Sequence, residues 1–138
     1  AEQDIEENAL AYEKLLRQKV PSLQFDLIML GMGEDGHTAS LFPETHGLHT
    51  KDRLVIANYD PQKQTWRMSF TYECIHMGRH ICIYVIGAKK ANMVAKVLLD
   101  SYDPDHFPSQ RIGTPSHKAL WILDREASEP LVRLMSES

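Results

Sequence analysis

The feature that most constrains the fold is a short apolar run that stops at a glycine-rich loop. Residues 25–30 read Phe-Asp-Leu-Ile-Met-Leu, and glycines follow at positions 31, 33 and 36. An apolar run of this length, bounded by a turn signal, is typical of a buried strand in a parallel sheet. We therefore predict a strand over residues 25–30, with the glycine loop at its carboxyl end.

The glycine loop also carries two side chains that can move protons. Asp35 and His37 stand two positions apart just beyond the predicted strand, at the edge where open α/β sheets bind ligands. An imidazole can exchange a proton near neutral pH, and a nearby carboxylate can orient the ring or stabilise its charged form. Backbone N–H groups in such a loop can bind an oxyanion. The candidates for that role are Gly31, Gly33 and Gly36. These residue types predict an acyl-transfer or proton-transfer site.

Each of these residues also has a purely structural interpretation. An Asx-type turn at Asp35 would shape the loop without any part in chemistry. In the same way, His37 would merely cap a short helix, and the glycines would serve only a tight turn. For Asp35 both interpretations stay open, whereas the setting of His37 favours the catalytic one.

The rest of the chain has the pattern of alternating helices and strands. Residues 4–19 are expected to form an amphipathic helix, because the apolar side chains Ile5, Ala9, Tyr12 and Leu16 recur there at helical spacing. The other expected elements are one or two helical turns at 38–42, strands at 54–57, 67–71, 81–86 and Leu120–Leu123, a helix at 89–99, and a last helix from a cap at Asp124 to about residue 134. This order predicts one α/β domain over residues 1–138, with a layered, mostly parallel, Rossmann-like sheet flanked by helices.

Composition argues against several classes of protein. A net charge of −4 and a pI of about 6.0 give no indication of binding to nucleic acid or to an anionic membrane, and no apolar run approaches the length of a membrane span. Cys74 and Cys82 fit neither a disulfide scaffold nor a zinc site, so we expect buried or half-buried thiols in a cytosolic protein. His46 and His49 have no other ligand type clustered with them, which favours loop residues over a metal site.

The loop also matches the outline of a dinucleotide fingerprint. Residues 31–36 spell G-x-G-x-x-G after a strand, and Asp60 ends the next predicted strand. Two physical objections apply. Glu34 and Asp35 would place negative charge where a pyrophosphate must sit, and Pro43 leaves room for only one or two helical turns, whereas a crossover helix needs roughly ten residues or more. We therefore keep a nucleotide-binding oxidoreductase as a minor alternative.

The segment 31–43, GMGEDGHTASLFP, closely resembles the signature of the 6-phosphogluconolactonases, the lactone hydrolases of the pentose phosphate pathway. The likeness continues in order along nearly the whole chain, through Ala-Tyr-Glu at 11–13, Trp-Arg-Met-Ser-Phe-Thr at 66–71, Gly-Ala-Lys-Lys-Ala at 87–91, and Trp-Ile-Leu-Asp at 121–124 followed by Ala127. Residues 72–76 depart from the pattern, because the family often has a more apolar run there.

The resemblance implies that this chain is the C-terminal portion of a larger α/β domain. The family's N-terminal region carries a glycine-rich Ser/Thr loop that helps to hold the substrate phosphate, and a later Asp-x-Arg segment; neither is present here. We therefore expect the N-terminal half of the same protein to be required for activity.

The resemblance also implies a reaction and roles for residues. The protein is expected to hydrolyse 6-phospho-D-glucono-1,5-lactone to 6-phosphogluconate in the cytoplasm, without a metal or an organic cofactor. His37 would act as general base on water with Asp35 beside it, and Gly31, Gly33 and Gly36 would contact the substrate.

Arg67 and Lys90 are the candidates for binding the substrate phosphate. Cations in the first turn of a helix oppose its dipole unless an anion docks there, and an arginine fork suits phosphate oxygens. The structural alternatives are a solvated lysine pair at Lys89 and Lys90 and a surface ion pair at Arg67. The resemblance favours Lys90 over Lys89.

Two rival functions share this scaffold. Glucosamine-6-phosphate deaminases carry a similar Asp-Gly-His loop, but they typically follow it with a segment ending Phe-Asn-Glu-Pro, and Ser-Leu-Phe-Pro at 40–43 lacks that glutamate. A non-catalytic sugar-phosphate sensor is the other rival. Such sensors can lose the catalytic histidine, whereas His37 is present and no DNA-binding segment is visible.

Overall fold

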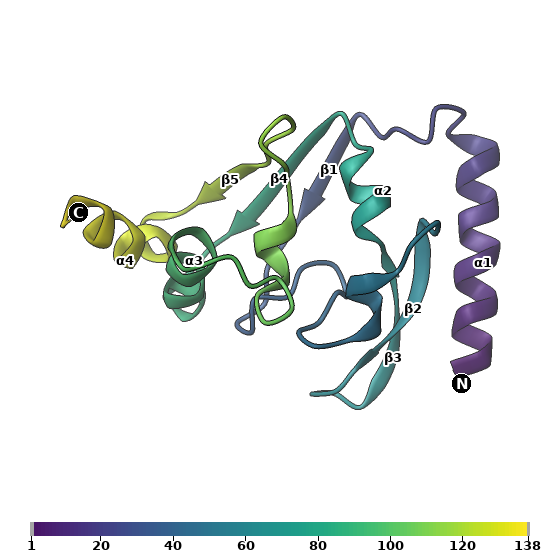
Figure 1. Cartoon of the computed structure of the whole chain (residues 1–138), viewed down its shortest axis with the longest axis horizontal. Coiled ribbons are helices and arrows are strands. Elements are labelled where there is room, and N and C mark those ends of the chain that lie inside the picture. Colours follow the sequence, from purple (N-terminus) through teal and green to yellow (C-terminus); the bar gives the residue numbers. More distant parts are fainter. Residues whose placement is uncertain (1, 138) are drawn as a thin grey trace.

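A three-stranded parallel sheet and a separate antiparallel hairpin form the framework of the chain (Figure 1). The computed structural model describes residues 2–137. Its strands are β1 (Leu27–Leu30), β2 (Val55–Asp60), β3 (Thr65–Phe70), β4 (His80–Val85) and β5 (Leu120–Leu123). Its α-helices are α1 (Glu2–Lys19), α2 (Tyr72–His76), α3 (Ala91–Leu99) and α4 (Arg125–Ser136), and its 3₁₀ turns are η1 (His46–His49), η2 (Ala88–Lys90) and η3 (Pro108–Arg111).

The parallel sheet has the strand order β1-β4-β5, with Leu30 opposite Ile83 and Ile83 opposite Trp121. One face of this sheet is buried under α3 and α4. The core there combines Ile28, Leu30, Ile81, Ile83 and Val85 of the strands with Val94, Ala95, Val97, Ala127 and Leu131 of the helices. The predicted α/β class and the parallel arrangement of these strands are confirmed.

The opposite face of the parallel sheet is apolar and exposed. We call this surface the open sheet face; it consists of Leu27, Met29, Tyr84, Leu120 and Ile122, whose exposed fractions run from 44% to 66%. Among the described residues, β1 pairs with β4 alone and so has one free edge. Parallel sheets are almost always covered on both faces, which makes the open sheet face the most unusual surface of the chain.

The hairpin β2–β3 stands apart from the parallel sheet. Its register places Val55 opposite Phe70, and its turn is held by Asp60, whose carboxylate accepts the backbone N–H groups of Gln62 and Lys63 at 3.0 and 3.2 Å. The second and third predicted strands are therefore present, but they pair with each other and contribute nothing to the parallel sheet.

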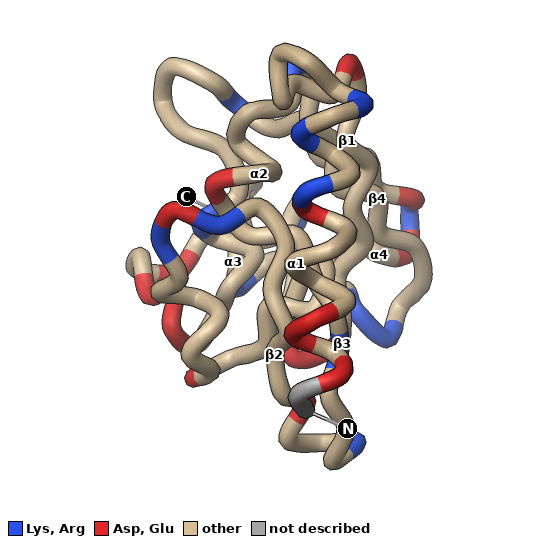
Figure 2. The backbone as a smooth tube through the Cα atoms, turned by 90° about the vertical axis from the view of Figure 1, so that its right-hand side faces the viewer, with Lys and Arg blue, Asp and Glu red and all other residues tan. Residues whose placement is uncertain are grey.

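Helix α1 packs on this hairpin through a mixed apolar and ionic face. Ala9 and Leu16 are buried, as the helical spacing predicts, whereas Tyr12 is exposed and Glu13 takes a buried place instead. Figure 2 shows that acidic residues gather near the start of α1 and basic residues near its end, as the helix dipole favours.

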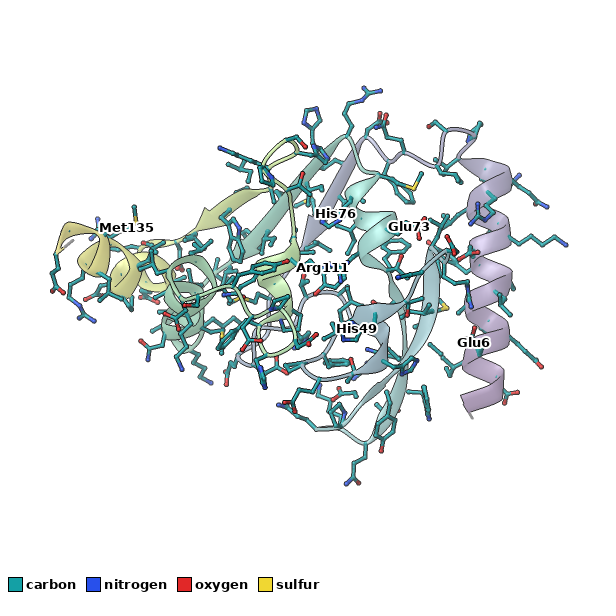
Figure 3. The ribbon with its side chains drawn as sticks, in the orientation of Figure 1. Glu6, His49, Glu73, His76, Arg111 and Met135 are labelled. Atoms are coloured by element: carbon teal, nitrogen blue, oxygen red, sulfur yellow. The ribbon has the colours of Figure 1, made fainter. Side chains whose placement is uncertain are left out.

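Glu13 anchors α1 to the start of β2. Its carboxylate accepts the backbone N–H groups of Leu54 and Val55 and the guanidinium of Arg53, which also pairs with Glu6 at 2.7 Å (Glu6 is labelled in Figure 3). Burial raises the pKa of Glu13, but these hydrogen bonds and the Arg53 charge outweigh burial, so its pKa lies below the ordinary value of 4.5.

Glu13→Gln is expected to lower the free energy of unfolding by about 1–3 kcal/mol, because buried backbone donors lose a charged acceptor. The Glu13 pKa is depressed in the folded state, so its contribution is complete above pH 4.5 and is lost as the pH falls through the folded pKa. Urea unfolding at about pH 7 and about pH 3 measures both effects. The exposed Glu129→Gln is the control; an equal loss for both variants at neutral pH contradicts the anchor.

Three local predictions need correction or extension. Residues 38–42 form no helical turn: Ala39 has φ +50°, and Thr38 and Leu41 form a bridge that closes a tight turn. Helix α2 was not predicted; Thr71, expected to end a strand, caps α2 by accepting the Cys74 N–H at 3.1 Å. The helix expected at 89–99 begins at Ala91, after the 3₁₀ turn η2.

Cys74 and Cys82 are free and buried, as predicted. The described part of the chain has no helix long and apolar enough to cross a bilayer.

Candidate active site

The glycine loop and the turn before α3 leave the same edge of the parallel sheet. This follows because β1 and β4 are parallel neighbours, so Gly31 and Gly87 both lie just past strand ends. A Cβ on Gly36 would lie 3.2 Å from Sδ of Met93 in the first turn of α3. Gly36 also has φ +85°, a conformation that favours glycine. The loop thus rests on the start of α3.

His37 and Asp35 form a direct pair within the loop. Nδ1 of His37 lies 2.5 Å from Oδ1 of Asp35, and the backbone N–H of His37 donates to the same oxygen at 3.1 Å. A carboxylate only accepts, so Nδ1 carries the proton and Nε2 carries the free lone pair. No hydrogen bond to Nε2 is present within residues 2–137. The His37 side chain is 31% exposed, so the ring is partly accessible from solvent.

The electrostatics of the pair favour an ionised carboxylate. Burial raises the pKa of Asp35, but the hydrogen bonds from the ring and backbone N–H of His37 more than offset it, so the pKa lies below 3.8. The ring of His37 also lies against Phe42, with 4.8 Å between ring centroids. Asp35 therefore does both things proposed for it: it shapes the loop through the backbone and orients the imidazole.

The structure assigns the N–H groups of Gly33 and Gly36 to the loop itself. Gly33 donates to the carbonyl of His37 at 2.9 Å, and Gly36 donates to the carbonyl of Gly33 at 3.0 Å. The expectation that these two N–H groups meet an oxyanion is therefore wrong. Gly33 is instead needed for space, since a Cβ there would lie 2.2 Å from Cε1 of His37. At Gly31, by contrast, a Cβ would meet nothing within 4 Å.

The far end of the loop is braced by polar groups on the hairpin. The N–H of Ser40 donates to Oγ of Ser69 at 3.0 Å, and Nδ2 of Asn58 donates to the carbonyl of Ser40 at 2.9 Å. Asn58 is fully buried, and Gly47 packs against its amide. Neither Ser69 nor Asn58 was predicted as a site residue. A polar amide within an otherwise buried apolar strand is the sequence signal that points to Asn58.

Arg67 lies on the loop-facing side of the hairpin. It alternates with Ser69 on β3 and stands opposite Asn58 on β2, so all three share one face. Arg67 is exposed, and within the described residues it forms no ion pair. The structural alternative for Arg67, a surface ion pair, is therefore not seen among the described residues.

Lys90 differs from its neighbour Lys89. Lys90 is half-buried at the N-cap of α3, whereas Lys89 is exposed. Met93, which touches the Gly36 position, lies one turn further along the same helix. The structure thus brings the start of α3, the His37 loop and the Arg67 face of the hairpin together from three separate segments.

The dinucleotide interpretation of the loop is wrong on structural grounds. A tight turn and no helix follows the G-x-G-x-x-G segment, so the N-terminal helix dipole that would hold a pyrophosphate is missing at residues 38–42. Asp60 is buried and holds the hairpin turn, so it is not free to bind a ribose.

Two open cavities lie in the described part of the chain. One of about 380 Å³ borders the loop and is lined by Ala39, Ser40 and Ser69 among others, and one of about 670 Å³ lies near Arg111 and Lys118, before β5. His37 and Asp35 line neither cavity. The reactive pair thus lies outside both of these cavities.

Comparison with known proteins agrees with the motif analysis. The family model for glucosamine-6-phosphate isomerases/6-phosphogluconolactonase matches residues 1–121. The 6-phosphogluconolactonase of Chlamydia trachomatis serovar D is 44% identical over 117 residues, covering 85% of this chain and 45% of the relative. The 6-phosphogluconolactonase of Synechocystis sp. is 41% identical over 108 residues, covering 78% of this chain and 43% of the relative.

A solved structure extends the likeness to the fold. The 6-phosphogluconolactonase from Trypanosoma cruzi superposes with a TM-score of 0.79 at 26% identity, covering 95% of this chain and 54% of that chain. This chain spans about half the length of the relatives it matches. By the extent of the family match, the chain belongs to the glucosamine-6-phosphate isomerase and 6-phosphogluconolactonase family.

Proposed function

We propose that this chain is the C-terminal portion of a longer protein, and that this protein hydrolyses 6-phospho-D-glucono-1,5-lactone to 6-phosphogluconate. The observation that carries the proposal is the His37–Asp35 pair, whose partly exposed imidazole lies at the carboxyl edge of a parallel sheet. The relatives named as 6-phosphogluconolactonases support it. We call the longer protein the parent.

In the proposed reaction, His37 moves one proton in each direction. Nε2 takes a proton from water as the water oxygen attacks the lactone carbonyl, which gives a tetrahedral oxyanion. Collapse of this intermediate breaks the bond to the ring oxygen, and the imidazolium returns the proton to that oxygen. Asp35 stays ionised throughout, because its pKa is depressed, and stabilises the imidazolium.

Substrate binding is proposed to fall to Gly31, Arg67 and Lys90. Gly31 is exposed with open space beside it, so its backbone is accessible to a ligand. Arg67 and the start of α3 flank the loop from two sides, and both a guanidinium and a lysine at a helix N-terminus suit a phosphate group.

Arg67→Ala and Lys90→Ala in the parent are each expected to reduce kcat/KM for the phosphorylated lactone by about 10- to 100-fold, since each removes a charge-assisted hydrogen bond. Activity on unphosphorylated gluconolactone is expected to change little. Lys89→Ala is the matched control, because Lys89 is adjacent and exposed. Equal losses on both substrates would rule out the phosphate role.

The N-terminal half of the parent is proposed to pack on the open sheet face and the free edge of β1. Such an arrangement would cover the apolar residues and pair the free strand, as parallel sheets require. It would also complete the cleft around His37. The buried free thiols of Cys74 and Cys82 fit a reducing compartment, and we propose a cytoplasmic location.

The decisive experiment assays the purified parent with two substrates. Faster acid release from 6-phosphogluconolactone than the spontaneous rate supports the proposal. Ammonia release from glucosamine 6-phosphate without any acceleration of lactone hydrolysis would identify a deaminase instead. Saturable lactone binding without turnover would identify a sensor.

A further inference from the structure

We propose that Ser109 is a positioning residue. It keeps His37 and Asp35 in hydrogen-bonding geometry by fixing the orientation of the peptide bond between Gly36 and His37. Only the kinetic test of this inference, described below, rests on the proposed function. Ser109 is 1% exposed, and its side chain and backbone both point at one atom. Its Oγ donates to the carbonyl of Gly36 at 2.7 Å, and its N–H donates to the same carbonyl at 3.0 Å.

The contacted carbonyl belongs to the peptide unit that carries the N–H of His37. In a planar trans peptide, C=O and N–H point in opposite directions, so fixing one end fixes the other. At the other end, the N–H of His37 donates to Oδ1 of Asp35, which is also the oxygen that holds Nδ1 of the ring. Ser109 and Asp35 therefore clamp one peptide plane from both sides.

This peptide needs to be held from both sides, because its backbone can rotate more freely than most. Gly36 has φ +85° and no side chain to limit rotation about its backbone. A small rotation of the peptide would move the His37 N–H away from Asp35 and loosen the contact at Nδ1. The two hydrogen bonds from Ser109 are the external contacts that oppose this rotation at the carbonyl.

Ser109 is itself held in place by buried contacts. Tyr72 donates its hydroxyl to the carbonyl of Pro108 at 2.7 Å, and the guanidinium of Arg111 lies 4.6 Å from the Tyr72 ring and donates to the carbonyl of Leu48. Figure 3 labels Arg111 near His76 of α2, and Nε2 of His76 lies 3.0 Å from the Arg111 carbonyl. The segment on both sides of Ser109 is thus anchored independently of the loop.

The test compares four variants of the full-length parent. Ser109→Ala removes the hydroxyl, and Ser109→Cys keeps similar bulk with a weak donor. Ser109→Thr keeps the hydroxyl and serves as the rescue. Ser128→Ala is the control for loss of a serine hydroxyl, because Ser128 donates to the carbonyl of Arg125 within α4 and lies outside the loop.

The kinetic expectation is a split between kcat and KM. Ser109→Ala and Ser109→Cys are expected to lower kcat by about 10-fold or more with KM nearly unchanged, since misplacement of a base affects the chemical step. Ser109→Thr and Ser128→Ala are expected to keep kcat near that of the unmodified parent. A normal kcat in both Ser109→Ala and Ser109→Cys would overturn the proposal.

A second test uses NMR spectroscopy to observe the His37–Asp35 hydrogen bond without any substrate. The downfield proton resonance of the His37 Nδ1–H, hydrogen-bonded to Asp35, is expected to broaden or disappear in Ser109→Ala and Ser109→Cys. In the same variants the pKa of Asp35 is expected to rise towards its ordinary value, because hydrogen bonds from His37 depress it. An unchanged resonance and an unchanged Asp35 pKa would overturn the proposal even if the parent proved not to be a lactonase.

Discussion

His37→Ala in the parent is expected to remove most of its lactonase activity, with a loss of about 10²- to 10⁴-fold in the rate above the spontaneous reaction. The variant retains the loop, because the backbone groups of His37 that bond to Gly33 and Asp35 remain. It loses the lone pair at Nε2 that is proposed to take the proton from water and to return one to the ring oxygen. Acid release from freshly prepared 6-phosphogluconolactone, measured in a weakly buffered solution, gives the rate directly.

The control for this experiment is His46→Ala, which removes an exposed imidazole from η1. Asp35→Asn is a graded second variant: its amide keeps the shape of the side chain but no longer stabilises an imidazolium. We expect its loss of rate to be smaller than that of His37→Ala. Near-normal turnover by His37→Ala would show that another group acts as the base.

Local signals in the sequence predicted several elements closely. The strand Leu120–Leu123 has the predicted bounds, and Asp124 caps α4 by accepting the N–H of Ala127 at 2.8 Å, as its position before a helix indicates. The β-branched run that forms β4 and the helical spacing in α1 were equally clear. In each case the residue pattern spans only a few positions, so the sequence contains the signal even where, as in β4 and β5, the strand pairs with a distant one.

The errors arose where distant residues decide the local structure. The turn at residues 38–42 forms because Ser40 bonds to the hairpin and Thr38 Oγ1 bonds to the carbonyl of Gly31 at 2.7 Å, which replaces helical hydrogen bonds with tertiary ones. The glycine N–H groups were assigned to an oxyanion because their partners inside the loop depend on the fold. Ser109 and Asn58 act on the loop from 73 and 18 residues away, a separation that no local motif records.

The predicted pair His37 and Asp35 is brought together, whereas Arg67 and Lys90 lie on two elements, β3 and the start of α3, whose neighbouring residues Ser69 and Met93 contact the loop. The distance between Asp35 and His37 in sequence is two residues, so their contact is a local property that the motif predicts well. Arg67 shares one face of β3 with Ser69, which contacts the loop, and the sequence indicates this only through the alternation of side chains along the strand. Their roles in substrate binding stay predictions, which the two-substrate comparison tests.

Residues 1–138 expressed alone are expected to self-associate and to have little lactone turnover. The open sheet face exposes five large apolar side chains next to the free edge of β1, and such a surface favours association with another copy. Neither of the two cavities described above includes His37, and we expect the lactone to lack the contacts that hold its carbonyl near Nε2. Loss of that positioning lowers kcat as well as affinity.

Light scattering and lactone turnover, measured on the same sample, test this expectation. Met29→Lys with Leu120→Lys is expected to reduce association, because both residues flank Cys82 at the centre of the open sheet face, whereas Leu99→Lys on α3 is a matched control outside it. The double variant is expected to gain no activity, since a charged face cannot replace the missing half of the cleft. Adding the separately expressed N-terminal half should restore turnover to the unmodified chain and not to the double variant, because the same face must then bind that half. A monomeric, fully active chain of residues 1–138 would show that the open sheet face has no structural partner and that the reactive pair needs none.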